Sequence, residues 1–261
     1  VCMEVLPFKA GLYRLGAGNM ARPIVVIHIK KTGLYGILGL IVLVMALMLF
    51  NRGCPIITGS RGGNLADKVS GRLIVLDPGH GGYDPGAVSM YGALEKDIVM
   101  AIAEHLGGLL NQAGIYTLFT READPPQAGK SRDVLLARKR RDLIERVDMA
   151  NTANADLFIS IHCNSFPQSI WSGAQVFFYP GRQESHRLAK AIQTELVNRL
   201  GPNRRQANAG DYRVIKDTRM PAVMVEVGFL SNPEEARLLA TPIYQEEVAH
   251  AIYHGILRYY H

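Results

Sequence analysis

Two histidines and two glutamates stand where an expected strand or helix meets a loop, and their side chains are the best suited to do chemistry. His80 follows the apolar run RLIVL within LDPGHGGYDPG, a glycine-rich turn that allows close approach of the backbone. His162 ends the apolar run LFISI, Glu226 ends AVMV, and Glu95 in GALEKD starts an expected helix. In open α/β sheets, sites form in the crevice beyond the carboxyl ends of the strands, so we expect these side chains to share a pocket.

Two imidazoles and one carboxylate are the ligand set of many hydrolytic zinc sites, in which a fourth position holds water and a second glutamate acts as general base. Zinc lowers the pKa of that water to about 7 and polarises a carbonyl, so the set favours amide hydrolysis at neutral pH. Spacing alone does not tell which glutamate is the ligand and which the base, and no HExxH helix decides it. Taken singly, Glu95 could instead complement a helix dipole, and each histidine could be an ordinary hydrogen-bonded group.

Other chemistries fit the sequence less well. HGGYDPG is neither a GxGxxG fingerprint nor a Walker loop, which disfavours nucleotide binding, and the absence of a GxSxG elbow disfavours an α/β-type serine hydrolase. Cys163 is the neighbour of His162 on one expected strand, so the two side chains point to opposite faces. Cys163 is therefore interpreted as a buried apolar residue.

Short apolar runs alternate with longer amphipathic ones after residue 70, which predicts a single α/β domain with a mostly parallel, roughly six-stranded sheet flanked by helices. The predicted strands are 72–76, 115–120, 157–161, 174–179, 213–215 and 222–227. The predicted helices are 95–112, 133–153, 184–200, 233–239 and 242–259.

The basic run at residues 138–141 raises the question of nucleic-acid binding. It lies on an expected helix with Asp142, Glu145 and Asp148 three or four residues further on, a spacing that favours ion pairs within the helix. We interpret the run as a solvated, internally paired face and exclude nucleic acid as a partner.

The composition, with 48% hydrophobic and 20% charged residues, excludes a disordered chain. The formal net charge of +6 comes entirely from residues 1–70, which hold eight lysines and arginines against Glu4 and Asp67. Residues 71–261 hold equal numbers of basic and acidic side chains. The charge is therefore a property of the N-terminal segment and gives the remainder no basic surface for an acidic partner.

Residues 33–50 are an uncharged apolar run of 18 residues, which at 1.5 Å per residue spans roughly the hydrocarbon thickness of a bilayer. The run is longer than the apolar region of most secretory signal peptides and no cleavage site follows it, so it favours an uncleaved signal anchor over a cleaved signal. Lys30 and Lys31 precede it, and the positive-inside rule then leaves the N-terminus in the cytoplasm. We predict a cytoplasmic segment (1–32), a transmembrane anchor (33–50), a flexible linker (51–70) and a catalytic domain outside the cytoplasm (71–261).

Residues 72–259 resemble the zinc-dependent N-acetylmuramoyl-L-alanine amidases of the amidase type 3 family. The motifs that carry the resemblance are LDPGHGGYDPGA (76–87), LEKD (94–97), RVDMAN (146–151), SIHCN (160–164) and VEVGFLSN (225–232). The resemblance implies one zinc ion bound by His80, Glu95 and His162, with Glu226 as the catalytic general base. Asn164, Arg146 and Trp171 are further candidates for contacts with the substrate or around the ligands.

Within that family the chain is most similar to the germination-specific, spore-cortex amidases, on WSGAQVFFYPG (171–181), MPAVMVEVGFLSNPEEARLL (220–239) and GILRYY (255–260). The expected reaction is hydrolysis of the amide between the lactyl group of N-acetylmuramic acid and L-alanine in peptidoglycan, on the way to muramic δ-lactam. A lipoprotein is a candidate activating partner. The alternatives are a zinc peptidase or deacetylase acting on another peptidoglycan amide, and a non-catalytic, membrane-tethered wall-binding protein.

Overall fold

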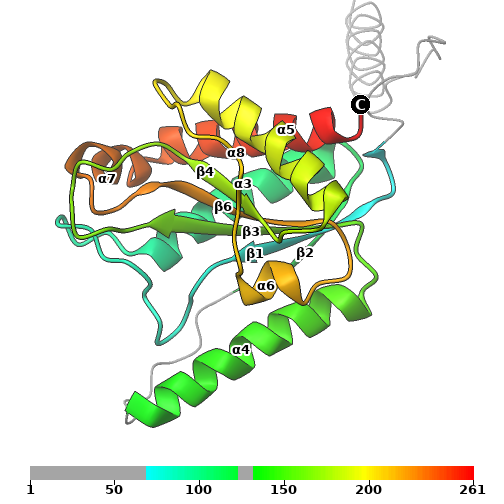
Figure 1. Cartoon of the computed structure of the whole chain (residues 1–261), viewed down its shortest axis with the longest axis horizontal. Coiled ribbons are helices and arrows are strands. Elements are labelled where there is room, and N and C mark those ends of the chain that lie inside the picture. Colours follow the sequence, from blue (N-terminus) through cyan, green and yellow to red (C-terminus); the bar gives the residue numbers. More distant parts are fainter. Residues whose placement is uncertain (1–68, 123–131) are drawn as a thin grey trace, which may run out of the picture. The chain divides into compact units, whose positions relative to one another are not determined.

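A six-stranded sheet forms the centre of the part of the chain that the structure, a computed structural model, describes: residues 69–122 and 132–261 (Figure 1). The strands are β1 (Leu73–Pro78), β2 (Tyr116–Phe119), β3 (Leu157–Asn164), β4 (Gln175–Phe178), β5 (Asn208–Ala209) and β6 (Ala222–Phe229). The helices are α3 (Glu95–Gln112), α4 (Arg132–Thr152), α5 (Gln183–Arg199), α6 (Arg213–Lys216), α7 (Pro233–Leu239) and α8 (Pro242–Tyr259).

The strand order is β2-β1-β3-β6-β4-β5. All neighbouring pairs are parallel except β4 with β6, which is antiparallel. This confirms the predicted α/β fold with one mostly parallel sheet. Because β1, β3 and β6 are adjacent and parallel, their carboxyl ends meet at one edge of the sheet, as a shared site requires.

The side chains of the strands alternate between two hydrophobic cores. Ile74 and Leu76 of β1 face the larger core, which α3, α5 and α8 cover, whereas Val75 faces a smaller core on the other side of the sheet. Helices α4 and α6 cover that second face (Figure 1). Cys163 is buried in the larger core, and burial raises the pKa of its thiol well above the ordinary value, as expected for a structural rather than a reactive cysteine.

The predicted strand at residues 213–215 is wrong, because this segment forms the short helix α6. Val214 and Ile215 are β-branched and favour a strand locally, but in one helical turn both are buried in the smaller core. Arg213 and Asp217 form an ion pair of 3.2 Å across that turn. The sixth strand is instead β5, which lies at the edge of the sheet beside β4. It has only two residues, too few to show a strand pattern in the sequence.

The predicted membrane helix at 33–50 and the linker at 51–70 lie outside the described residues, apart from Val69 and Ser70. Within residues 69–122 and 132–261, no helix combines the length and apolar character needed to span a bilayer.

Glycine 255 allows α8 to pack directly against the backbone of α5. A Cβ at this position would lie 2.5 Å from the Ile192 Cα, which is too close for any real contact. We expect Gly255→Ala to lower the free energy of unfolding by about 1–3 kcal/mol, because the two helices would have to separate. Urea unfolding of the variant checks this.

The matched control is Gly108→Ala, at an exposed position of α3 where a Cβ would contact nothing within 4 Å. Alanine there is expected to stabilise the helix by about 0.5–1 kcal/mol. Equal effects of the two substitutions would show that the packing of α8 against α5 is looser than described.

Candidate metal centre and active site

His80 lies just beyond the end of β1, in a backbone conformation that is unusual for a residue with a side chain. Its φ is 59°, in the left-handed region. The ring Nδ1 lies 3.0 Å from Asp84 Oδ2, so the other ring nitrogen, Nε2, is directed at Glu95. A carboxylate that orients a histidine through its second nitrogen is the usual support of a metal-binding imidazole.

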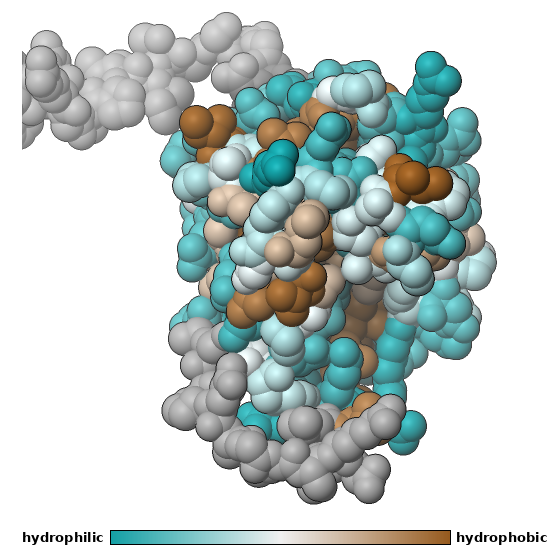
Figure 2. Space-filling model, turned by 90° about the vertical axis from the view of Figure 1, so that its left-hand side faces the viewer, coloured by the Kyte–Doolittle hydropathy of each residue, from teal (hydrophilic) through white to brown (hydrophobic). Residues whose placement is uncertain are grey.

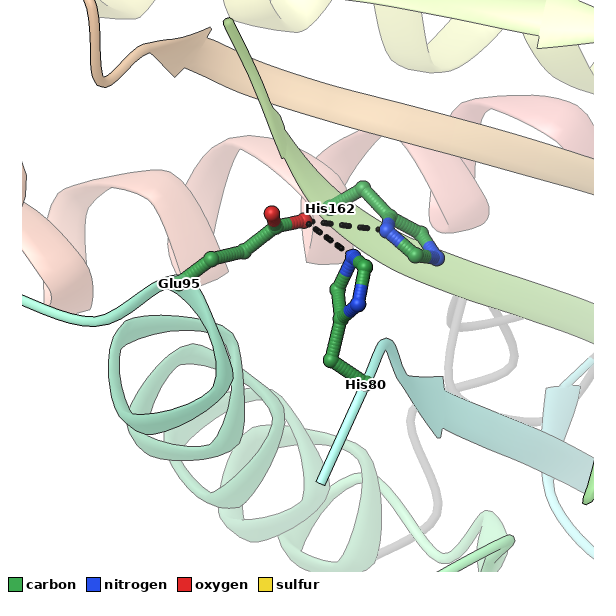
Figure 3. Close-up of side chains that lie close together, drawn as sticks. All are labelled: His80, Glu95 and His162. Carbon is green, nitrogen blue, oxygen red and sulfur yellow. Dashed lines mark hydrogen bonds and ion pairs between the residues drawn. The ribbon is translucent and has the colours of Figure 1, made fainter. Parts of the chain in front are cut away.

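Glu95 is the first residue of α3, and its carboxylate joins the two histidines (Figure 3). Its Oε1 lies 3.1 Å from His80 Nε2 and 3.0 Å from His162 Nδ1. Two backbone amides fix the carboxylate: Cys163 N donates to Oε1 at 2.9 Å, and Ala87 N donates to Oε2 at 2.8 Å. With 3% of its surface exposed, Glu95 is a buried and fully oriented ligand candidate.

His162 and Glu226 are neighbours across the pair of strands β3 and β6. Both lie inside their strands rather than at the ends, because β3 continues to Asn164 and β6 to Phe229. The pairing shifts register between His162 and Asn164, an irregularity of the kind that β-bulges introduce next to active sites. The shared register places the imidazole and the Glu226 carboxyl on the same face of the sheet.

Glu226 has the properties of a proton-transfer group. Its Oε2 is buried and has no hydrogen-bond partner among residues 69–122 and 132–261. Burial raises the pKa of Glu226 to about 7, although the neighbouring histidines act in the opposite direction. A carboxyl group with a pKa near neutrality can both accept and return a proton under physiological conditions.

The donor atoms of His80, Glu95 and His162 fit a metal ion. One ligand atom from each residue lies within 4.8 Å of the other two. Burial alone would raise the pKa of Glu95, but its hydrogen bonds with the two histidines hold it well below its usual range. Burial alone would lower the pKa of His80, but its hydrogen bonds to Asp84 and Glu95 outweigh this and raise it to about 9. Two nitrogens and one carboxylate oxygen match the ligand preference of zinc.

Two glycines make the space for this cluster. A Cβ at residue 79 would lie 2.2 Å from His162 Cε1, so the ring of His162 packs directly over the backbone of Gly79. A Cβ on Gly86 would lie 2.5 Å from Glu95 Oε2 and 2.8 Å from His80 Cδ2. The glycine-rich motif therefore brings the backbone close to the ligands, as its composition predicts.

Three further residues, which the sequence marks as candidates for contacts with the substrate or around the ligands, lie in different surroundings. Arg146 contacts the backbone of the His80 loop, donating to the carbonyls of His80 and Pro78. Asn164 Oδ1 accepts a hydrogen bond from Ser165 N, so its side chain is engaged in a local turn. Trp171 lies 45% exposed in the loop between β3 and β4, where its ring packs at 6.4 Å from that of Phe166.

The face of the molecule toward which the β3 arrow points in Figure 1 carries several hydrophobic patches among hydrophilic side chains (Figure 2). Three large apolar residues of the β3–β4 loop are exposed: Phe166, Ile170 and Trp171. This loop is fixed to its surroundings, because Gly173 N donates to Glu235 Oε1 at 2.7 Å and Arg205 Nε donates to the Ser172 carbonyl at 2.7 Å.

Sequence reasoning missed Asp84 and Asp77. Asp84 is the carboxylate that holds His80, and Asp77 is a buried acid that binds Arg146. A signal for Asp84 is present in the sequence, since it stands four residues after His80 in HGGYD. For Asp77 the only signal in the sequence is that a charged residue stands near the end of an otherwise apolar strand.

Fold and site together define an α/β enzyme built around a candidate metal centre with a buried carboxylic acid beside it. The chain belongs to the N-acetylmuramoyl-L-alanine amidase family, whose sequence profile matches residues 74–258. It is therefore an N-acetylmuramoyl-L-alanine amidase, an enzyme that acts on peptidoglycan.

Individual relatives agree with this assignment. The germination-specific N-acetylmuramoyl-L-alanine amidase of Bacillus subtilis is 44% identical over 194 residues, covering 74% of this chain and 81% of the relative. The CwlD amidase of Clostridioides difficile, solved in complex with the GerS lipoprotein, is 39% identical with a TM-score of 0.68 over 72% of this chain and 98% of its own. The catalytic domain of CwlV from Bacillus (Paenibacillus) polymyxa is 31% identical with a TM-score of 0.62, covering 71% of this chain and 96% of that domain.

Proposed function

We propose that this amidase is zinc-dependent and hydrolyses the bond between the lactyl group of N-acetylmuramic acid and L-alanine in spore-cortex peptidoglycan, before muramic δ-lactam forms. The observation that carries the metal dependence is the convergence of three ligand atoms, from His80, Glu95 and His162, beside Glu226, whose buried Oε2 has no hydrogen-bond partner within residues 69–122 and 132–261. The cortex as substrate rests on the similarity to the germination-specific amidase.

His80, Glu95 and His162 would hold the zinc ion. Bound there, zinc would supply a water of lowered pKa and would polarise the scissile carbonyl. Glu226 accepts a proton from the attacking water while the new carbon–oxygen bond forms. It then donates that proton to the L-alanine nitrogen as the carbon–nitrogen bond breaks, which leaves a free amine and a lactyl carboxylic acid that loses its remaining proton to the solvent at neutral pH.

The location and the partners of the enzyme are part of the same proposal. The apolar run at 33–50, with Lys30 and Lys31 before it, supports a membrane anchor that places the catalytic domain outside the cytoplasm, on the cell-wall side. A lipoprotein is the proposed partner, because the similar CwlD amidase was solved in complex with one. Residues 71–261 hold equal numbers of basic and acidic side chains, so we propose no nucleic-acid partner.

Digestion of purified peptidoglycan tests the reaction. We expect mass spectrometry to find free stem peptides that begin with L-alanine, together with glycan chains that have lost their peptides. A peptidase would instead leave L-alanine on the glycan, and a deacetylase would release acetate. Chelator-treated protein is the control for metal dependence, since it is expected to release neither product.

Cortex and vegetative peptidoglycan, digested in parallel, test the substrate. The proposal requires faster release of peptide from the cortex. Equal rates on both polymers would contradict the cortex assignment while leaving the amidase reaction intact.

A further inference from the structure

Helix α4 presents three polar side chains along one stripe: Lys139, Asp142 and Arg146, spaced three and four residues apart. This stripe contacts residues 77–84, the loop that carries His80; we call that loop the histidine loop. The sequence predicts that the basic run at residues 138–141 pairs with acidic residues of its own helix, and for Lys139 this prediction is wrong. Lys139 instead forms an ion pair of 2.8 Å with Asp84, on a distant part of the chain.

Arg146 binds the start of the histidine loop. Its Nη1 donates to Asp77 Oδ1 at 2.7 Å and to the Pro78 carbonyl at 2.9 Å, and its Nη2 donates to the His80 carbonyl at 2.5 Å. The partner carboxylate is 1% exposed and also accepts hydrogen bonds of 2.6 Å from Ser160 and Thr120. The guanidinium is thereby fixed in orientation and holds two backbone carbonyls at once.

Lys139 and Asp142 bind the other end of the loop. The Lys139 ammonium and His80 Nδ1 share the same oxygen of Asp84, at 2.8 and 3.0 Å. Tyr83 donates to Asp142 at 2.9 Å, and the guanidinium of Arg138 lies 4.8 Å from the centre of the Tyr83 ring. Side chains of α4 therefore contact both ends of the segment that presents the metal ligand.

The backbone conformation of His80 explains why contacts from α4 matter. A residue with a side chain in the left-handed region is strained and keeps that conformation only when its surroundings impose it. Arg121 binds the Pro78 and Gly79 carbonyls from the β2 side. Among the described residues outside the loop, α4 supplies the hydrogen bond to the His80 carbonyl and the ion pair to Asp84 Oδ2, while Gly86 N donates to the other oxygen of Asp84.

We infer that Lys139 and Arg146 are positioning residues that hold His80 in its ligand geometry, so that α4 sets the order of the histidine loop and the affinity of the metal site. The part that concerns the metal rests on the proposed function. The basic run thereby acquires a role within the enzyme, which its composition alone does not indicate.

Hydrogen exchange of the metal-free 261-residue chain tests this without any metal. The turn of the histidine loop is closed by backbone hydrogen bonds between Gly81 and Asp84. We expect peptides covering residues 77–86 to exchange several-fold faster in Lys139→Gln and in Arg146→Gln. Arg141→Gln is the matched control, because Arg141 is an exposed residue of the same helix and has no ion-pair partner within the described parts of the chain.

Zinc affinity, measured by competition with a chromogenic chelator, tests whether α4 also sets the affinity of the metal site. Loss of an outer partner of a metal ligand typically weakens binding about 10–100-fold. We expect such a loss in both glutamine variants, no change in Arg141→Gln, and recovery in Lys139→Arg, which keeps the ion pair with Asp84. The d–d spectrum of the cobalt-substituted chain is expected to change in the same variants.

Parent-like exchange and parent-like affinity in Lys139→Gln and Arg146→Gln would overturn the inference. If Arg146→Gln fails to fold, the half-exposed Lys139 decides the question through its glutamine and arginine variants. A parent chain that binds no zinc would refute the proposed function, whereas the exchange measurement would still judge the role of α4.

Discussion

Glu226→Gln is expected to lower kcat of peptide release by about 10²–10⁴-fold, the range attributed to a positioned general acid–base group, with little change in zinc affinity. Glutamine has nearly the same shape but cannot accept the proton of the attacking water. The buried Oε2 of Glu226 has no hydrogen-bond partner in the described residues, so the substitution breaks no hydrogen bond of that oxygen there. Muropeptide release at saturating substrate, with zinc content measured on the same sample, checks this result.

The control for Glu226→Gln is Glu234→Gln, which changes a surface carboxylate on α7. It is expected to keep the parent rate. A parent rate in Glu226→Gln with full zinc content would show that another group takes the proton.

His162→Ala is expected to abolish stoichiometric zinc binding and, with it, peptide release. The imidazole is one of the three ligand candidates, and losing it removes a donor atom rather than a supporting contact. The loss of affinity is therefore expected to exceed the roughly 10–100-fold typical of an outer partner. Metal analysis after dialysis and the rate of peptide release at fixed free zinc measure the two effects.

His105→Ala is the matched control for His162→Ala, because His105 is an exposed histidine on α3. Thermal unfolding separates loss of the metal from loss of the fold. Zinc is expected to raise the Tm of the parent and of His105→Ala but not that of His162→Ala. Retention of one zinc ion per chain in His162→Ala would remove His162 from the ligand set.

The architecture and the four central residues could be predicted because their signals are local. The sequence patterns of α3, α7 and α8 predicted the bounds that the structure has, and side-chain caps begin α7 and α8. In α7, for example, the Asn232 side chain accepts from the backbone amides of Glu234 and Glu235, with Pro233 at the first position. Short motifs likewise located the ligand candidates: His80 just after β1, Glu95 at the start of α3 and His162 near the end of β3.

The errors arose where contacts between distant segments determine the structure. Val214 and Ile215 form a helical turn because the smaller core buries them, against their strand preference. Lys139 pairs with Asp84 rather than with an acid of its own helix, and no local pattern connects these two segments. The membrane anchor at 33–50 stays a prediction, since it lies outside the described residues.

The three ligand candidates come from separate segments, and His162 follows Glu95 by 67 positions in the chain. An unfolded chain therefore contains no preformed metal site, and only the completed sheet brings the donors together. Zinc that binds the native state alone would add RT ln(1 + [Zn]/Kd) to the free energy of unfolding. The stability of the amidase would then follow the free zinc concentration of its compartment, so that metal supply influences how much folded enzyme persists as well as how fast it works.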